Sequence, residues 1–157
     1  MNALEVKNLI KRYGEKVAVN DLSFEIKKGE FFGFLGPNGA GKTTTINSIT
    51  GIGRFDAGEI KVFGLDVVRD YREARKKIGL SPQELNADFF RTVHKTLDFV
   101  GGYFGMRKPE REDRMEYLFS ELGLAPYKNT QFRALSGGFK RRVMLARAMM
   151  HDPEILI

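Results

Sequence analysis

The sequence predicts an α/β fold in which an antiparallel β part comes first and a mostly helical part follows. Residues 4–7 and 22–26 alternate apolar and polar side chains, as half-buried strands do. Later segments repeat apolar residues at intervals of three and four, as amphipathic helices do. With 157 residues, 42% of them hydrophobic, the chain has the size of one domain with a substantial core.

The first half of the chain is predicted to alternate strands with short helices. Lys28-Gly29 indicates a turn, and residues 31–35 read FFGFL, a continuous apolar run that predicts a strand covered on both faces. A glycine-rich loop follows, and residues 43–50 predict a helix that ends at Gly51. Three short segments come next: a strand over 58–64, a charged helix from 70, and a strand and loop from 78.

The second half is predicted to be mainly helical. One helix begins at Thr92, with Val93, Leu97 and Val100 on one face, and another begins at Pro109 and ends at Gly123. The last helix starts near residues 136–138 and carries an apolar stripe of Phe139, Val143, Ala146 and Met150. The chain then turns at Pro153 and ends in three aliphatic residues, which predict the start of a buried strand.

Composition limits the classes of function. The net charge of +6 suits anionic partners, although a solvated basic surface explains it equally well. The absence of cysteine excludes disulfides, thiolate metal sites and a cysteine nucleophile, and the two histidines are far apart in sequence. No segment has the length and apolarity of a membrane span or a secretory signal, so we expect a cytoplasmic location.

The strongest motif is GPNGAGKT at residues 36–43, which fits the pattern of a phosphate-binding loop at every fixed position. Glycines let the backbone turn tightly, and the amide groups of the loop and helix start then surround a phosphate. Lys42 would place its charge on the β- and γ-phosphates, and Thr43 would offer a hydroxyl to Mg²⁺. The motif indicates nucleoside triphosphate and Mg²⁺ binding, and it leaves kinases, GTPases and transport ATPases open. The expected cofactor-binding residues here are Gly36, Pro37, Asn38, Gly39, Ala40, Gly41, Lys42, Thr43 and Thr44.

A second motif, LSGG at residues 135–138, places Ser136 and two glycines before a helix. Together with the phosphate loop and with Gln83 in SPQE, it resembles the ATP-binding subunits of ABC transporters over nearly the whole chain. The resemblance implies a P-loop NTPase (RecA-like) core with an antiparallel β subdomain and a helical subdomain at about 84–135, all within one ATP-binding domain over 1–157, incomplete at the C-terminus.

The resemblance also implies how ATP is held. Tyr13 matches the aromatic residue that stacks on adenine, and Gln83 would reach Mg²⁺ or the attacking water. Two ATP-binding subunits, identical or different, would pack head to tail, and Ser136, Gly137 and Gly138 of one would contact the γ-phosphate held by the other. The implied partners are membrane subunits at the inner face of the cell membrane, with no nucleic acid. Phe139 stands where the family most often has glutamine, and together with KRR at 140–142 and with GPNGAGKTTT it makes the chain look more like export-type ABC-2 systems than nutrient importers.

The strand at the end of the chain is where the family carries its catalytic acids. Asp152, Glu154 and His151 precede that strand, so none receives a catalytic role, and we expect little ATP hydrolysis by this chain alone. Two alternatives remain: a nucleic-acid- or ribosome-associated ABC ATPase, and a non-catalytic ATP-binding module. The codons that follow Ile157 would discriminate the second, and the lack of zinc-binding cysteines and of a long heptad segment argues against the first.

Overall fold

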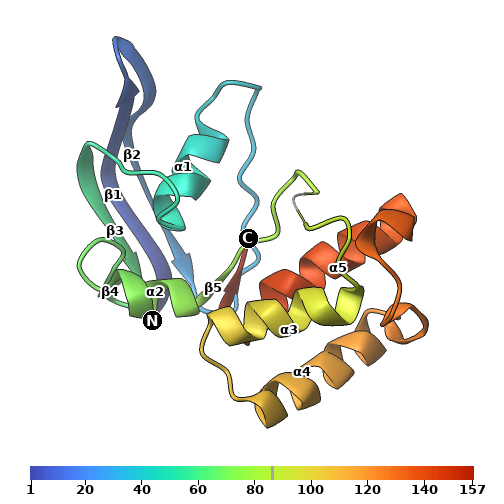
Figure 1. The fold of residues 1–157 in the computed structure, drawn as a ribbon. Helices are drawn as coiled ribbons and strands as arrows, with labels where there is room; N and C mark the ends of the chain where they lie inside the picture. Colours follow the sequence, from blue (N-terminus) through green and yellow to red (C-terminus); the bar gives the residue numbers. More distant parts are fainter. Residues whose placement is uncertain (86) are drawn as a thin grey trace. The chain divides into compact units, whose positions relative to one another are not determined.

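The structure is a computed structural model that describes residues 1–85 and 87–157. The chain divides into two compact units, Met1–Lys77 and Ile78–Ile157. The first unit contains an antiparallel sheet with two short helices, and the second contains three longer helices with a small parallel strand pair (Figure 1). The predicted α/β fold class is therefore confirmed.

The sheet of the first unit has the strand order β2-β1-β3-β4. Its strands are β1 (Asn2–Tyr13), β2 (Lys16–Lys27), β3 (Ala57–Val62) and β4 (Leu65–Asp66), and each neighbouring pair is antiparallel. Val6 lies opposite both Phe24 and Ile60, and it is fully buried. The alternating segments thus form strands as predicted, and both extend further than the alternation alone indicates because they pair along a long hairpin.

Two helices complete the first unit, α1 (Lys42–Ile49) and α2 (Tyr71–Lys76). The side chain of Arg75 in α2 donates a hydrogen bond of 2.6 Å to the carbonyl oxygen of Gly51, just after the end of α1. That contact joins the C-terminal ends of the two helices. Both helices lie where the sequence predicts them.

The predicted strand at residues 31–35 is wrong for this structure. The segment is extended but belongs to no strand, and Phe31 and Leu35 are 102% and 93% exposed. The rings of Phe32 and Phe34 pack against Phe24 at centroid distances of 5.4 and 5.7 Å. A strand exists only where neighbouring backbone groups bond to it, and within residues 1–85 and 87–157 no strand is paired to this segment.

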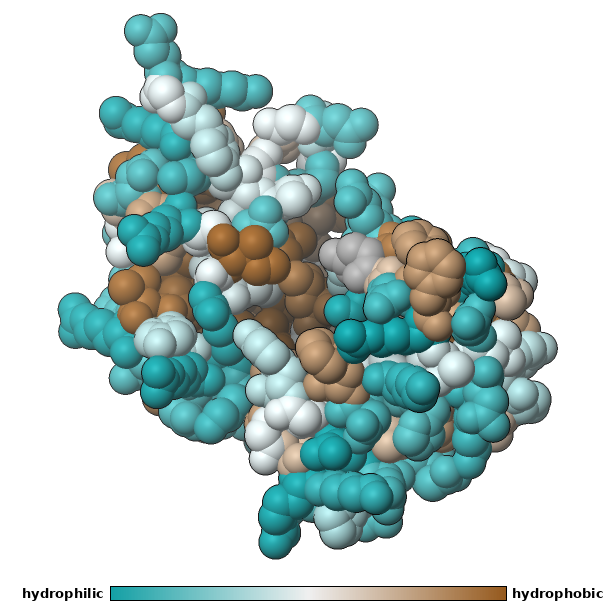
Figure 2. Space-filling model, viewed as in Figure 1, coloured by the Kyte–Doolittle hydropathy of each residue, from teal (hydrophilic) through white to brown (hydrophobic). Residues whose placement is uncertain are grey.

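The second unit contains α3 (Val93–Tyr103), α4 (Lys108–Glu121), α5 (Gly137–Met149) and a parallel pair of short strands, β5 (Ile78–Gly79) and β6 (Ile155–Leu156). Two 3-10 turns, η1 (Ala125–Tyr127) and η2 (Phe132–Ala134), connect α4 to α5. Apolar side chains from all three helices form its core, among them residues of the stripes predicted for α3 and α5, whereas hydrophilic residues cover most of the molecular face seen in Figure 2. The core includes Val93, Leu97, Met115, Leu118, Phe119, Phe132, Val143, Met144, Ala146 and Met150.

His151 has a structural role in the second unit. Its Nε2 atom donates to the carbonyl oxygen of Ile78 over 3.1 Å, and its ring stacks on Phe104 at 3.7 Å. Its Nδ1 atom is buried and has no partner among the described residues. Burial lowers the pKa of His151, so the neutral ring is favoured. The residue fastens the turn after α5 to β5.

Candidate functional site

The phosphate loop lies in the first unit, between the extended segment and α1. Gly39 and Gly41 have φ angles of +84° and +85°, a backbone region that other residues rarely occupy. Gly36 is outside that region, so the turn itself does not require glycine there. Gly41 is the N-cap of α1 and lies against β2, where a Cβ atom would be 2.3 Å from the carbonyl oxygen of Ala18. Of the glycines Gly36, Gly39 and Gly41, the last two therefore have the left-handed backbone that favours glycine.

Lys42 begins α1 and turns its side chain back over the loop. Its Nζ atom donates to the carbonyl oxygens of Gly36 and Pro37, the latter at 2.7 Å. The amide groups of the first helical turn have no carbonyl partner within the helix, and they point out of the N-terminal end of α1. An exposed loop with a positive charge and free amide donors is chemically an anion site, and Thr43 adds an exposed hydroxyl.

Replacing Gly41 with alanine is expected to destabilise the protein and weaken phosphate binding. The left-handed φ and the contact with Ala18 together should cost about 1–3 kcal/mol of unfolding free energy. Denaturant titration measures this loss. Gly33→Ala is the control, because Gly33 has ordinary φ and an added Cβ there meets no described atom within 4 Å. Equal stability of the Gly41 and Gly33 variants would contradict the account.

Tyr13 is the last residue of β1, at the tip of the hairpin with β2, and the residue is 56% exposed. Lys11 places its Nζ atom 5.1 Å from the ring centroid. At the residue next to Tyr13, Asp56 accepts a hydrogen bond of 2.6 Å from the amide of Arg12. That bond lowers the pKa of Asp56, and burial opposes it less strongly. An exposed aromatic face is therefore available in the unit that carries the phosphate loop.

Gln83 lies in the second unit, on the loop that follows the carboxyl end of β5, and it is exposed. β5 is fixed by its parallel neighbour, since the amide of Ile157 donates to Gly79 and the amide of Ser81 donates to Ile157, both at 2.8 Å. In parallel sheets, ligand-binding side chains follow the carboxyl ends of strands. Gln83 has that position. Asp152 and Glu154 do not, because both precede β6.

The LSGG segment forms the start of α5. Ser136 is the N-cap, and its side chain makes no capping hydrogen bond in the described part of the chain, so its hydroxyl is available. Ser136, Gly137 and Gly138 are exposed, whereas Leu135 before them is buried and anchors the turn. The predicted arrangement of a serine and free amide donors at a helix start is therefore present. Phe139 packs on Tyr127 at a centroid distance of 4.2 Å and supports that start from within the unit.

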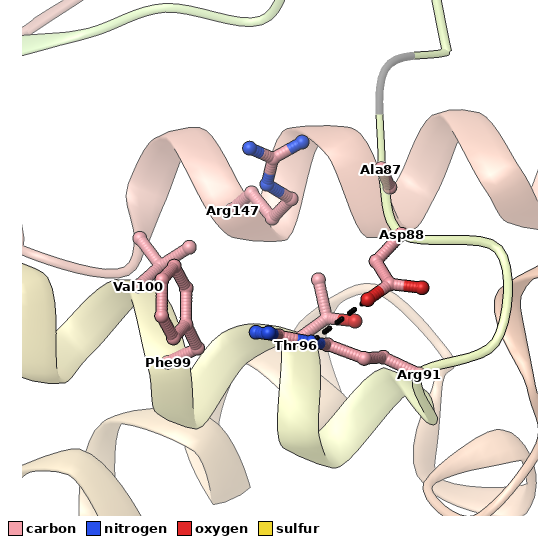
Figure 3. Close-up of a pocket in the computed structure, with 7 residues that line it drawn as sticks. All are labelled: Ala87, Asp88, Arg91, Thr96, Phe99, Val100 and Arg147. Carbon is pink, nitrogen blue, oxygen red and sulfur yellow. Dashed lines mark ion pairs between the residues drawn. The ribbon is translucent and has the colours of Figure 1, made fainter.

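A small cavity of about 210 Å³ beside α3 and α5 was not predicted from the sequence (Figure 3). Arg91 and Asp88 form an ion pair of 3.0 Å at its edge, and the Arg91 guanidinium lies 4.5 Å from the Phe99 ring centroid. Arg147 of α5 also lines it, and burial lowers the pKa of that guanidinium. No local motif marks the cavity, because its lining comes from residues 87–91, from α3 and from α5, which lie far apart in the sequence.

Known proteins match this chain over nearly its whole length. The sequence profile of the family described as ABC transporter matches residues 19–157. Linearmycin resistance ATP-binding protein LnrL from Bacillus subtilis (strain 168) is 41% identical over 154 residues, which cover 98% of this chain and 50% of that protein. Nod factor export ATP-binding protein I from Paraburkholderia xenovorans (strain LB400) is 43% identical over 155 residues, 99% of this chain and 51% of that protein.

Comparison with solved structures also finds subunits of ABC transporters. An ATP binding subunit of an ABC transporter superposes with a TM-score of 0.88 and 27% identity, covering 98% of this chain and 64% of that one. The structure of cbiO1 from Clostridium perfringens, described as part of the ABC transporter complex cbiONQ, gives 0.86 and 26%, with 99% and 64% covered. The chain spans about half the length of the curated relatives it matches.

Proposed function

The chain belongs to the ABC transporter family, and from that premise we propose that it binds ATP with Mg²⁺ and serves as the ATP-binding subunit of a transporter. The observation that carries the proposal is the phosphate loop at the start of α1. Its left-handed glycines and the ammonium of Lys42 make an anion site whose sequence is that of a nucleotide-binding loop.

The remaining residues have defined roles in the proposal. Tyr13 stacks on the adenine ring, and the loop residues 36–44 surround the phosphates. Thr43 and Gln83 provide oxygen atoms to Mg²⁺, which prefers oxygen ligands and keeps several waters. No group of three or more His, Cys, Asp or Glu side chains in residues 1–85 and 87–157 could hold a metal ion. Most of the ligands of Mg²⁺ would then be phosphate oxygens and water.

A second ATP-binding subunit and membrane subunits are the proposed partners. Ser136, Gly137 and Gly138 are exposed at a helix start, and they would contact the γ-phosphate held by the neighbouring subunit in a head-to-tail dimer. None of the helices in the described part of the chain has the length and apolarity needed to cross a membrane. We propose a peripheral position at the inner face of the cell membrane. The names of the curated relatives, which refer to export and to resistance, support transport rather than nucleic-acid processing.

Calorimetric titration of the full-length protein with nucleotides tests the proposal. We expect saturable binding of ATP that tightens with Mg²⁺ and is lost for AMP, because AMP lacks the β- and γ-phosphates that the loop would hold. If AMP binds as tightly as ATP, or if ATP does not bind, the proposed site is wrong.

A further inference from the structure

Arg141 holds the peptide group that precedes Gln83. Its Nη1 atom donates a hydrogen bond of 3.3 Å to the carbonyl oxygen of Pro82, although the two residues are 59 positions apart. The carbonyl of Pro82 and the amide nitrogen of Gln83 belong to one planar peptide group. A donor that fixes this oxygen therefore also restricts the backbone from which the Gln83 side chain extends.

The far end of the same loop is held by the segment before the LSGG motif. The amide of Arg133 donates to the carbonyl of Phe89 at 3.1 Å, and the amide of Phe132 donates to the carbonyl of Arg91 at 3.0 Å. Both donors lie in η2, which leads into Leu135 and Ser136. Backbone bonds thus connect Phe89 and Arg91 to the residues before Ser136, and the Arg141 side chain connects the Pro82 carbonyl to the helix after it.

We propose that Arg141 is a positioning residue that fixes Gln83 relative to Ser136, so that both side chains move together when nucleotide binds. This rests on the proposed function, in which Gln83 serves the ATP of its own subunit and Ser136 serves the ATP of the neighbouring one. A rigid connection between them makes the two nucleotide sites of a dimer sense each other, and such coupling acts equally in both directions.

The neighbouring Arg142 provides a matched control. It is also an exposed arginine on α5, and it also donates to a main-chain oxygen, that of Leu122, at 3.2 Å. Its guanidinium lies 5.1 Å from the ring centroid of Phe139. Arg141→Met and Arg142→Met therefore each remove one hydrogen bond of the same kind from the same helix, and only the first acts on the Gln83 loop.

A spin label next to Gln83 tests the contact without nucleotide. These 157 residues contain no cysteine, so Glu84→Cys adds a single labelling position to this part of the chain, at an exposed residue. In the full-length protein we expect Arg141→Met to make the label more mobile, Arg141→Lys to restore part of the restriction, and Arg142→Met to leave it unchanged. Unchanged mobility in Arg141→Met, or an equal increase in Arg142→Met, would overturn the proposal.

A second measurement tests the consequence for nucleotide. Arg141→Met should leave the affinity for Mg²⁺-ATP within about twofold and weaken ATP-dependent dimerisation about 3- to 10-fold, the range of one hydrogen bond. Dimerisation that equals that of the wild type, while the label is more mobile, would overturn the positioning role. If ATP does not bind at all, the proposed function fails, and the label experiment still decides whether Arg141 restrains the loop.

Discussion

Replacing Lys42 with methionine is expected to weaken ATP binding about 10- to 100-fold, the size of a hydrogen bond between charged groups. Among the described residues, the ammonium bonds to the loop carbonyls of Gly36 and Pro37, and a bound phosphate would offer it oxygen acceptors in their place. Methionine keeps the length of the side chain but has no charge and no donor. Calorimetric titration with Mg²⁺-ATP measures the loss.

The fold should tolerate Lys42→Met, so a loss of ATP affinity in this variant can be distinguished from a loss of stability. The bonds of Lys42 are exposed, so their removal should cost less than about 1 kcal/mol of unfolding free energy. Lys28→Met is the control, since Lys28 is an exposed lysine in the turn after β2 and lies outside the loop. An affinity for ATP that Lys42→Met leaves intact would remove the central residue of the proposed site.

Replacing Gly138 with aspartate is expected to abolish ATP-dependent dimerisation, with a loss of about 100-fold or more, while ATP binding to the same chain stays within about twofold. The new carboxylate would face the γ-phosphate held by the neighbouring subunit, and like charges in an interface cost several kcal/mol. Sedimentation of the full-length protein with Mg²⁺-ATP measures the association.

The fold should accept the Gly138→Asp substitution. Gly138 is exposed, has no left-handed φ, and an added Cβ meets no atom of the described residues within 4 Å. A negative charge in the first turn of a helix is also favourable. Gly138→Asn is the control, because it has nearly the same size and no charge, and it should retain much more dimer than the aspartate variant. Equal losses for both would show that bulk, rather than charge, is responsible.

Local patterns in the sequence predicted most of the elements. Alternation located β1 and β2, and the apolar stripes located α3 and α5, because these patterns report which face of an element is buried. The glycine-rich motif located Gly39 and Gly41, whose left-handed backbone is a local requirement. A serine before two glycines likewise predicted the start of α5 at Gly137, with Ser136 as its N-cap.

What the sequence did not predict depends on contacts between distant residues. The apolar run at 31–35 indicates a tendency to be buried, but a strand also needs a neighbour, and exposed Phe31 and Leu35 show that burial is incomplete. The bond from Arg141 to Pro82 has no local signal, since an arginine next to the LSGG motif looks like any solvated charge. Its partner is set by how α5 packs against β5.

The most direct test of the central claim mixes two defective variants of the full-length protein. If the phosphate loop of one subunit and the LSGG segment of the other form a shared site, Lys42→Met and Gly138→Asp complement each other, because their heterodimer retains one intact site. We predict that each variant alone stays monomeric with Mg²⁺-ATP, and that an equimolar mixture forms dimers in sedimentation. A mixture that remains monomeric while the wild type dimerises, or a variant that dimerises alone as the wild type does, would contradict the account.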